Sequence, residues 1–125
     1  KFKYLILLQP TSPQRTYKDL NNACEKVLKN KEADALVSSY ELKNINSNKI
    51  MFFDGKYLSL NINKKWKKNI KCFYRNGPSI IITKIKNIDK TNIYENGRII
   101  NFTMQQNKSV DVNTFNDFKK LINNF

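Results

Sequence analysis

Apolar residues in the first part of the chain predict a strand, a helix and a second strand in succession. Residues 3–8 form a nearly continuous apolar run, which is typical of a strand covered on both faces of a parallel sheet. Thr16 and Asp19 have the spacing of a capping box and predict a helix start. The apolar residues that follow share one helix face: Leu20, Ala23, Cys24, Val27 and Leu28. Residues 35–40 predict the next strand, which completes a βαβ unit with a right-handed crossover.

The stretch 44–73 departs from this α/β pattern. After the polar residues 44–48, the apolar runs 50–53 and 57–60 flank Asp54 and Gly55 and predict a β-hairpin with a tight turn. An isolated hairpin is only marginally stable in water. We therefore expect this hairpin to rest on a core of its own or on a partner subunit.

The remaining apolar segments predict three more strands and a closing helix. The strands are expected at 79–83, 99–104 and 110–112. Thr114 and Asp117 repeat the capping-box spacing. The helix that follows has an apolar face made of Phe115, Phe118, Leu121, Ile122 and Phe125. The chain of 125 residues is thus expected to form one α/β domain, 1–125.

Composition removes several classes of chemistry. The chain has no histidine, which excludes imidazole catalysis and histidine-ligated zinc within it. Its three glycines lie too far apart for a Walker loop or a dinucleotide-binding turn. Cys24 and Cys72 do not form a C-x-x-C pair, and the apolar run at the N-terminus is too short to span a membrane. We therefore expect a reduced, cytoplasmic protein that does not enter a membrane.

The net charge of +13 has two interpretations. Lysines that neutralise phosphates would give unspecific nucleic-acid binding, and the densest patch, Lys64–Lys71 around Trp66, suits that role. The same patch suits a solvated hairpin flank, because runs of like charge are usually exposed. We favour the solvated interpretation and expect no specific nucleic acid as a partner. The rare arginines, among them Arg15 and Arg75, indicate sites that use a planar guanidinium against a carboxylate or phosphate.

The segment Leu7–Thr16 (LLQPTSPQRT) carries polar groups at the end of the first strand. Gln9, Ser12 and Arg15 offer amide, hydroxyl and guanidinium groups at a sheet edge where α/β proteins bind ligands. The two prolines stiffen the loop, so that less ordering is needed on binding. The alternative is a rigid turn that only introduces the capped helix.

This segment resembles the LLQPTSPLRT motif of the N-acylneuraminate cytidylyltransferases, the CMP-sialic acid synthetases and their legionaminic-acid relatives. A second segment, 73–82 (FYRNGPSIII), is similar to the family's Arg and Asn-Gly stretch that enters a strand. A third, 108–118 (KSVDVNTFNDF), is similar to the motif that precedes the family's last helix. The three segments follow the family's order and together span most of the chain.

The resemblance implies a nucleotidyltransferase that transfers CMP from CTP to a nine-carbon acidic sugar and releases pyrophosphate with the help of Mg²⁺. It implies a partial Rossmann-like nucleotidyltransferase sheet, of which residues 1–125 are the carboxyl-terminal portion. The stretch 44–73 then corresponds to the family's dimerisation hairpin, so that a homodimer is expected. Two anions must meet in such a reaction, which requires a cationic site and a metal ion.

Carried over by motif, the resemblance assigns binding roles but no catalytic residue in this chain. The residues expected at the substrate are Gln9, Ser12, Arg15, Arg75 and Asn76. Asp111 and Asn113 fall on the family's metal-binding positions. From the residues alone, Asp111 has an alternative role as an acid near a helix start.

The chain also departs from the family's pattern. Asn113 replaces the second metal-binding aspartate and brings no charge, Tyr74 takes the position at which many members have the sugar-binding arginine, and Pro78 replaces a small residue. The family's Gly- and Lys-rich nucleotide loop is absent, so the chain alone is expected to lack activity. A relative that keeps the fold and dimer surface without catalysis is the alternative, and the sequence does not distinguish sialic from legionaminic acid.

Overall fold

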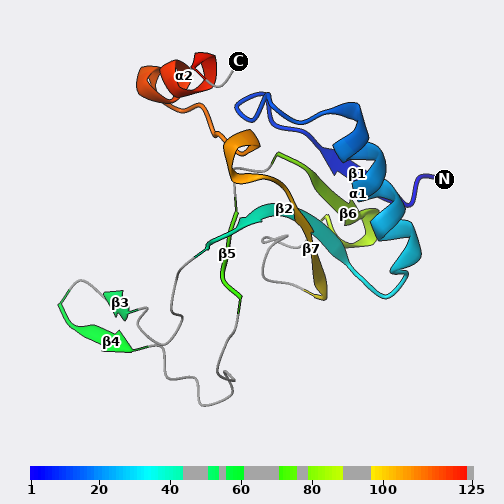
Figure 1. The fold of residues 1–125 in the computed structure, drawn as a ribbon. Coiled ribbons are helices and arrows are strands. Elements are labelled where there is room, and N and C mark those ends of the chain that lie inside the picture. Colours follow the sequence, from blue (N-terminus) through cyan, green and yellow to red (C-terminus); the bar gives the residue numbers. More distant parts are fainter. Residues whose placement is uncertain (44–50, 54–55, 61–70, 76–78, 89–96, 124–125) are drawn as a thin grey trace.

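The computed structural model describes residues 1–43, 51–53, 56–60, 71–75, 79–88 and 97–123. Its strands and helices are, in chain order, β1 (Tyr4–Leu7), α1 (Tyr17–Lys29), β2 (Ala35–Glu41), β3 (Met51–Phe53), β4 (Leu58–Leu60), β5 (Phe73–Tyr74), β6 (Ile81–Lys84), β7 (Ile99–Thr103) and α2 (Phe115–Ile122). Short 3₁₀ turns follow β6 and β7, at Ile85–Asn87 and Gln106–Lys108. Figure 1 shows a mixed sheet of β1, β6, β2, β5 and β7 with α1 packed along it and α2 beyond its upper end, while β3 and β4 form a separate pair.

The sheet is mostly antiparallel. β6 lies between β1 and β2 and runs antiparallel to both, while β7 pairs with β2 in parallel. β1 and β2 therefore point the same way, as the βαβ pattern predicts, but they are not neighbours. The α/β class is confirmed at this level, whereas the all-parallel arrangement suggested by the apolar run 3–8 is wrong.

β1 differs most from its expected environment. Its apolar run predicts burial on both faces, but Leu5, Ile6 and Leu7 are 41%, 43% and 39% exposed. The reason is its position, because among the described residues only β6 pairs with it. An apolar run therefore marks here the edge of the sheet rather than its centre.

Helix α1 begins as its sequence predicts. The Thr16 hydroxyl accepts from the Asp19 N–H, and the Asp19 carboxylate accepts from the Thr16 N–H at 2.8 Å, which completes the capping box. Ala23 and Val27 are buried, and Leu20 and Cys24 pack against them. Leu28, expected on the same face, is 60% exposed, so this part of the prediction is wrong.

A small core lies between α1 and one face of the sheet. Its buried members come from the helix, from β2 and from the segment around β6: Ala23, Val27, Leu36, Ile80 and Ile82. Tyr4, Leu8, Ile100 and Phe102 pack around them. All these sheet residues lie on the face that α1 covers, so the helix fixes the orientation of β1 and of the loop that follows it.

Asp34 joins the starts of β2 and β7 at one end of the sheet. Its backbone N–H donates to Arg98 O at 2.8 Å, and its carboxylate accepts from Arg98 N–H at 3.0 Å. Gly97 precedes Arg98 with φ of +98°, and a Cβ at this position would lie 2.6 Å from the Asp34 carboxylate. Glycine is therefore required here both by its backbone conformation and by space.

The predicted hairpin is present in part. β3 and β4 pair antiparallel, with Phe53 opposite Leu58. The turn at 54–55 and the rest of the stretch 44–73, including Lys64, Trp66 and the neighbouring lysines, lie outside the described residues except for 56–60 and 71–73. Whether the hairpin is a dimerisation element therefore stays a prediction.

In the C-terminal region the predicted helix cap is confirmed, but the apolar face of the helix is mostly exposed. Thr114 and Asp117 form the predicted capping box of α2. Residues 110–112 are not a strand, because they connect the second 3₁₀ turn to α2 without pairing with a described strand. Leu121 is buried, but Phe115, Phe118 and Ile122 are exposed, so most of the predicted apolar face does not pack on the sheet. Phe125 lies outside the described residues.

Within the described part of the chain, neither helix is long and apolar enough to cross a membrane.

Candidate functional site

The loop 8–16 follows β1 and is held in shape by Arg15. The Arg15 guanidinium donates through Nη1 to the carbonyl oxygens of Gln9 and Ser12, each at 2.7 Å. The Ser12 N–H also donates to Gln9 O at 3.3 Å. Arg15, predicted to bind substrate, therefore has described bonds that brace the loop from within. Gln9 stays half-buried at the start of this loop.

A single backbone hydrogen bond joins two of the predicted motifs. Val112 N–H donates to Thr11 O at 2.7 Å, which ties the loop after β1 to the segment before α2. The residues next to these two, Ser12 and Asp111, thereby lie at the same junction. Two motifs from opposite ends of the sequence thus meet at one edge of the sheet, beyond the carboxyl end of β1 (Figure 1).

Four buried side-chain oxygen atoms in the three motifs have no hydrogen-bond partner among the described residues. They are Ser12 Oγ, Gln14 Oε1, Ser79 Oγ and Asp111 Oδ1. Ser12 and Ser79 are only 4% and 1% exposed. A buried polar atom without a partner costs about 1–3 kcal/mol, and such atoms commonly mark a place where a ligand, ion or water completes the bonding.

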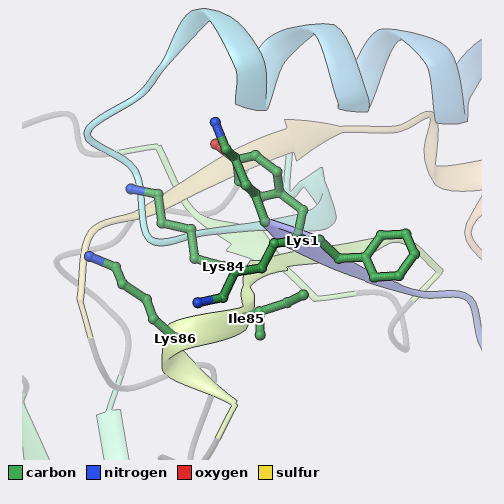
Figure 2. A pocket seen from close by; sticks show the side chains of 7 residues that line it. Lys1, Lys84, Ile85 and Lys86 are labelled. Carbon is green, nitrogen blue, oxygen red and sulfur yellow. The ribbon is translucent and has the colours of Figure 1, made fainter.

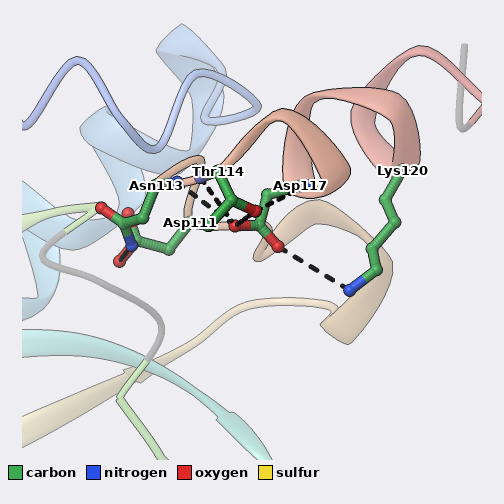
Figure 3. Close-up of polar contacts among 5 residues, drawn as sticks. All are labelled: Asp111, Asn113, Thr114, Asp117 and Lys120. Carbon is green, nitrogen blue, oxygen red and sulfur yellow. Dashed lines mark hydrogen bonds and ion pairs between the residues drawn. The ribbon is translucent and has the colours of Figure 1, made fainter.

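Asp111 and Asn113 lie side by side at the junction. Asn113 Nδ2 donates to Asp111 Oδ2 at 2.9 Å, so the amide binds one carboxylate oxygen and leaves Asp111 Oδ1 without a partner. Figure 3 shows this pair next to the α2 cap. Asp117 is not free to join them, because Asp117 Oδ2 accepts from the Thr114 N–H and hydroxyl. Chiefly the hydrogen bond from the Thr114 side chain lowers the pKa of Asp117.

The side-chain oxygens of Asp111 and Asn113 suit Mg²⁺ but supply only part of its coordination. Mg²⁺ usually takes one or two carboxylates and completes its six oxygens with water and substrate phosphates. Asp111 supplies one carboxylate with an unpartnered oxygen, and Asn113 supplies an amide oxygen. No group of three His, Cys, Asp or Glu suited to a metal occurs among the described residues, so an ion held here would depend on a phosphate-bearing ligand.

Arg75 belongs to a different part of the sheet. Arg75 is exposed and directly follows β5, which pairs with Tyr40 and Glu41 at the end of β2. Both β5 and β6 pair with β2, through Tyr74 opposite Tyr40 and Ile81 opposite Val37. Tyr74 and Ile81 are seven positions apart in the chain, whereas Tyr40 and Val37 are three apart. The register with β2 is therefore not continuous from β5 to β6. Asn76 lies in this interval, outside the described residues, as do Gly77 and Pro78.

The structure thus brings together five of the predicted residues, Gln9, Ser12, Arg15, Asp111 and Asn113. Sequence reasoning missed Gln14 and Ser79, although both lie inside the quoted motifs. Ser79 immediately precedes the apolar run of β6 and was counted as part of that strand. The sequence signal that could have identified it is a serine directly before an apolar run, inside one of the family-like motifs.

A pocket of about 470 Å³ lies at the carboxyl ends of β2 and β7. It is lined by Tyr40, Glu41, Lys43, Thr103, Met104, Gln105, Gln106 and Asn107. None of the predicted site residues lines it, so this hollow is separate from the junction of the two motifs.

Comparison with known proteins adds no assignment. No protein-family model matches the chain, and no curated protein matches its sequence significantly. The similarity of the three motifs to the cytidylyltransferases therefore stands as a resemblance.

Proposed function

We propose that this chain is the carboxyl-terminal portion of a CMP-sugar synthetase that acts on a nine-carbon acidic sugar. Its fold would then be part of a Rossmann-like nucleotidyltransferase sheet. The observation that supports the proposal best is the hydrogen bond from Val112 N–H to Thr11 O, since it joins two of the three family-like motifs beside unpartnered oxygens of Ser12 and Asp111.

In the proposed reaction, the anomeric hydroxyl oxygen of the sugar attacks the α-phosphorus of CTP. A new phosphorus–oxygen bond forms, the bond to the β-phosphate breaks, pyrophosphate leaves, and the hydroxyl proton is released to water. Asp111 and Asn113 would hold Mg²⁺, which offsets the negative charge that accumulates on the phosphates. This assignment uses the one carboxylate oxygen at the junction that has no partner.

The remaining residues would bind and orient the sugar. Gln9 and Ser12 would hydrogen-bond its hydroxyl groups, because their amide and hydroxyl can both donate and accept. The resemblance alone assigns the sugar carboxylate to Arg75 and Asn76, and a guanidinium offers a carboxylate two parallel bonds. The described structure places Arg75 beside the end of β2, away from the junction. Arg15 acts indirectly by bracing the loop that carries Gln9 and Ser12, which reduces the ordering needed on binding.

The proposal is tested by binding of the reaction product, CMP-N-acetylneuraminate, in the presence of Mg²⁺. Amide chemical shifts should change at residues 9–15 and 110–114, and the changes should disappear in Asp111→Asn. They should persist in the control Asp34→Asn, because Asp34 lies at the other end of the strands, before β2. A matched ligand with the sugar carboxylate esterified should bind more weakly. Shifts confined to other parts of the chain would contradict the assignment.

The chain alone should release no pyrophosphate when it is mixed with CTP and sialic acid, because it lacks the family's nucleotide loop.

A non-catalytic relative that serves as a dimerising scaffold is the second candidate. Asn113, where the family has a charged metal ligand, favours it. The two candidates differ in one measurable property, because a scaffold needs neither Mg²⁺ nor the sugar nucleotide at the junction. Absence of binding together with a homodimeric mass in sedimentation would favour the scaffold.

A further inference from the structure

The hollow at the carboxyl ends of β2 and β7, here called the polar hollow, has a lining that suits hydroxyl groups. Its volume is about 470 Å³, and Gln105, Gln106 and Asn107 are among the residues that line it. All three are exposed, and their side-chain amides have no hydrogen-bond partner among the described residues. A carboxamide both donates and accepts, which is what a hydroxyl group needs from its partner. The polar hollow therefore complements a ligand that carries several hydroxyl groups.

The backbone that carries these amides is already ordered. Met104 N–H donates to Ser39 O at 2.8 Å, which holds the end of β7 against β2. Gln105 O accepts from the Lys108 N–H at 3.0 Å and from the Ser109 hydroxyl at 2.8 Å. A ligand that binds the amides must therefore order their side chains, but not the turn beneath them.

The polar hollow is connected to the junction at Asp111 by a short stretch of chain. Asn107 precedes Asp111 by four residues, which span at most about 14 Å when fully extended. Tyr40, which also lines the hollow, pairs with Tyr74, and Arg75 follows directly. The hollow is therefore within reach of a sugar nucleotide whose phosphate lies at the junction, and it adjoins the arginine that the resemblance assigns to the sugar carboxylate.

A larger hollow of about 570 Å³ does not offer this combination. It lies where β1 begins and β6 ends, and Figure 2 shows Lys1, Lys84 and Lys86 around it. β1 and β2 point the same way, since both run antiparallel to β6. This lysine-rimmed hollow therefore lies at the opposite end of the strands from the junction, and of the two hollows only the polar one is near Asp111.

We propose that the polar hollow binds the hydroxylated side chain of the sugar, and that Gln105, Gln106 and Asn107 determine which sugar is accepted. This inference rests on the proposed function. In CMP-sialic acid the phosphate and the carboxylate are bonded to the same carbon, whereas the hydroxylated side chain extends away from the ring. With the phosphate at Asp111, the side chain is the part that can enter the hollow. The lining then favours a side chain with hydroxyl groups over one that ends in a methyl group, which would leave the amides without partners.

The test compares CMP-N-acetylneuraminate with the same compound after its side chain has been shortened by mild periodate oxidation and borohydride reduction. In NMR titrations with Mg²⁺, both ligands should shift the amide signals of residues 9–15 and 110–114. The side-chain amide signals of Gln105, Gln106 and Asn107 should shift far more with the intact ligand. Signals of residues 84–86, in the lysine-rimmed hollow, should shift with neither.

The affinities from the same titrations identify the residues responsible. The shortened ligand should bind the wild-type chain about threefold to tenfold more weakly than the intact one. The double variant Gln106→Ala, Asn107→Ala should bind both ligands alike, because it lacks the amides that distinguish them. Asn22→Ala, on the exposed surface of α1, is the matched control and should keep the wild-type difference.

The outcomes separate this inference from the proposed function. Equal affinities of the two ligands for the wild-type chain, or an unchanged difference in the double variant, overturn the inference. The proposed function survives that result if residues 9–15 and 110–114 still shift. If neither ligand shifts these residues, the proposed function is wrong and the inference is overturned with it.

Discussion

At the scale of single residues, Asp34 shows how one carboxylate can hold the start of two strands. Its carboxylate accepts from Arg98 N–H, its backbone N–H donates to Arg98 O, and its carbonyl oxygen accepts from Lys84 N–H at 3.1 Å. The backbone bond from Arg98 is the main cause that lowers the pKa of Asp34 below its ordinary value of 3.8. The charged form is thus the one that the fold favours.

This lowered pKa predicts a pH dependence of stability. A carboxyl whose pKa is lower in the folded state stabilises the fold above its unfolded pKa, and the contribution is lost as pH falls through the folded pKa. Asp34→Asn should therefore be less stable than the wild type in urea unfolding at pH 7, and the difference should shrink below about pH 3.8. A difference that is constant between pH 7 and pH 3 would contradict this role.

Asn113 is the residue at which the proposed metal site can be strengthened. Replacing it with Asp puts a second carboxylate beside Asp111 and removes the amide bond to Asp111 Oδ2. We expect Asn113→Asp to bind Mg²⁺ about tenfold more tightly, since affinity for hard cations rises with ligand charge. Isothermal titration with MgCl₂ in the presence of CMP-N-acetylneuraminate measures the change, with Asn30→Asp at the distant end of α1 as the control. Equal gains in both variants would point to general charge rather than to a site.

At the scale of elements, the loop after β1 depends on one side chain. Arg15→Gln removes a charged donor from the carbonyl oxygens of Gln9 and Ser12, and we expect a loss of about 1–2 kcal/mol in the stability of the loop. Arg98→Gln is the matched control, because the Arg98–Glu32 pair is mostly exposed to solvent and an exposed ion pair contributes about 0–1 kcal/mol. Hydrogen exchange at Ser12 and Val112 should speed up only in Arg15→Gln.

Helix α2 depends on its cap because few of its side chains pack on the sheet. Thr114→Ala removes the hydroxyl that accepts from Asp117 N–H at 3.2 Å, at an expected cost of about 1 kcal/mol. Such a cost should unravel the first turn of the helix, which carbon chemical shifts of residues 115–118 would reveal. Thr114→Ser retains the cap and should leave these shifts unchanged. Unaltered shifts in Thr114→Ala would show that packing, not the cap, holds the helix.

The elements differ in how well the sequence predicts them. Both helix starts were predicted, because a capping box is a local interaction encoded in four consecutive positions. Residues 3–8 were assigned to a buried parallel strand, since an apolar run does not reveal which strands will be its neighbours. The prediction that Leu28 is buried was wrong for the same reason, because its exposure depends on how far the sheet extends beneath α1.

At the scale of the whole molecule, topology decides what the site contains. The loop at 9–15 and the segment 110–113 were each identified from their residues, but their contact arises only because β1, β6, β2 and β7 align as they do. Gln14 and Ser79 were missed, since burial of a polar side chain depends on that long-range arrangement. The sequence thus named candidate residues but did not show which buried side-chain oxygens have no partner among the described residues.

Ser12 and Asp111 are proposed to belong to one cation-binding junction. The most direct measurement adds paramagnetic Mn²⁺ in place of Mg²⁺, with CMP-N-acetylneuraminate present to supply a phosphate, and records which backbone amide signals broaden. Signals of residues 11–14 and 110–113 should broaden together at low Mn²⁺, and Asp111→Asn should abolish both effects. Broadening of only one of the two segments, or unchanged broadening in Asp111→Asn, would contradict it.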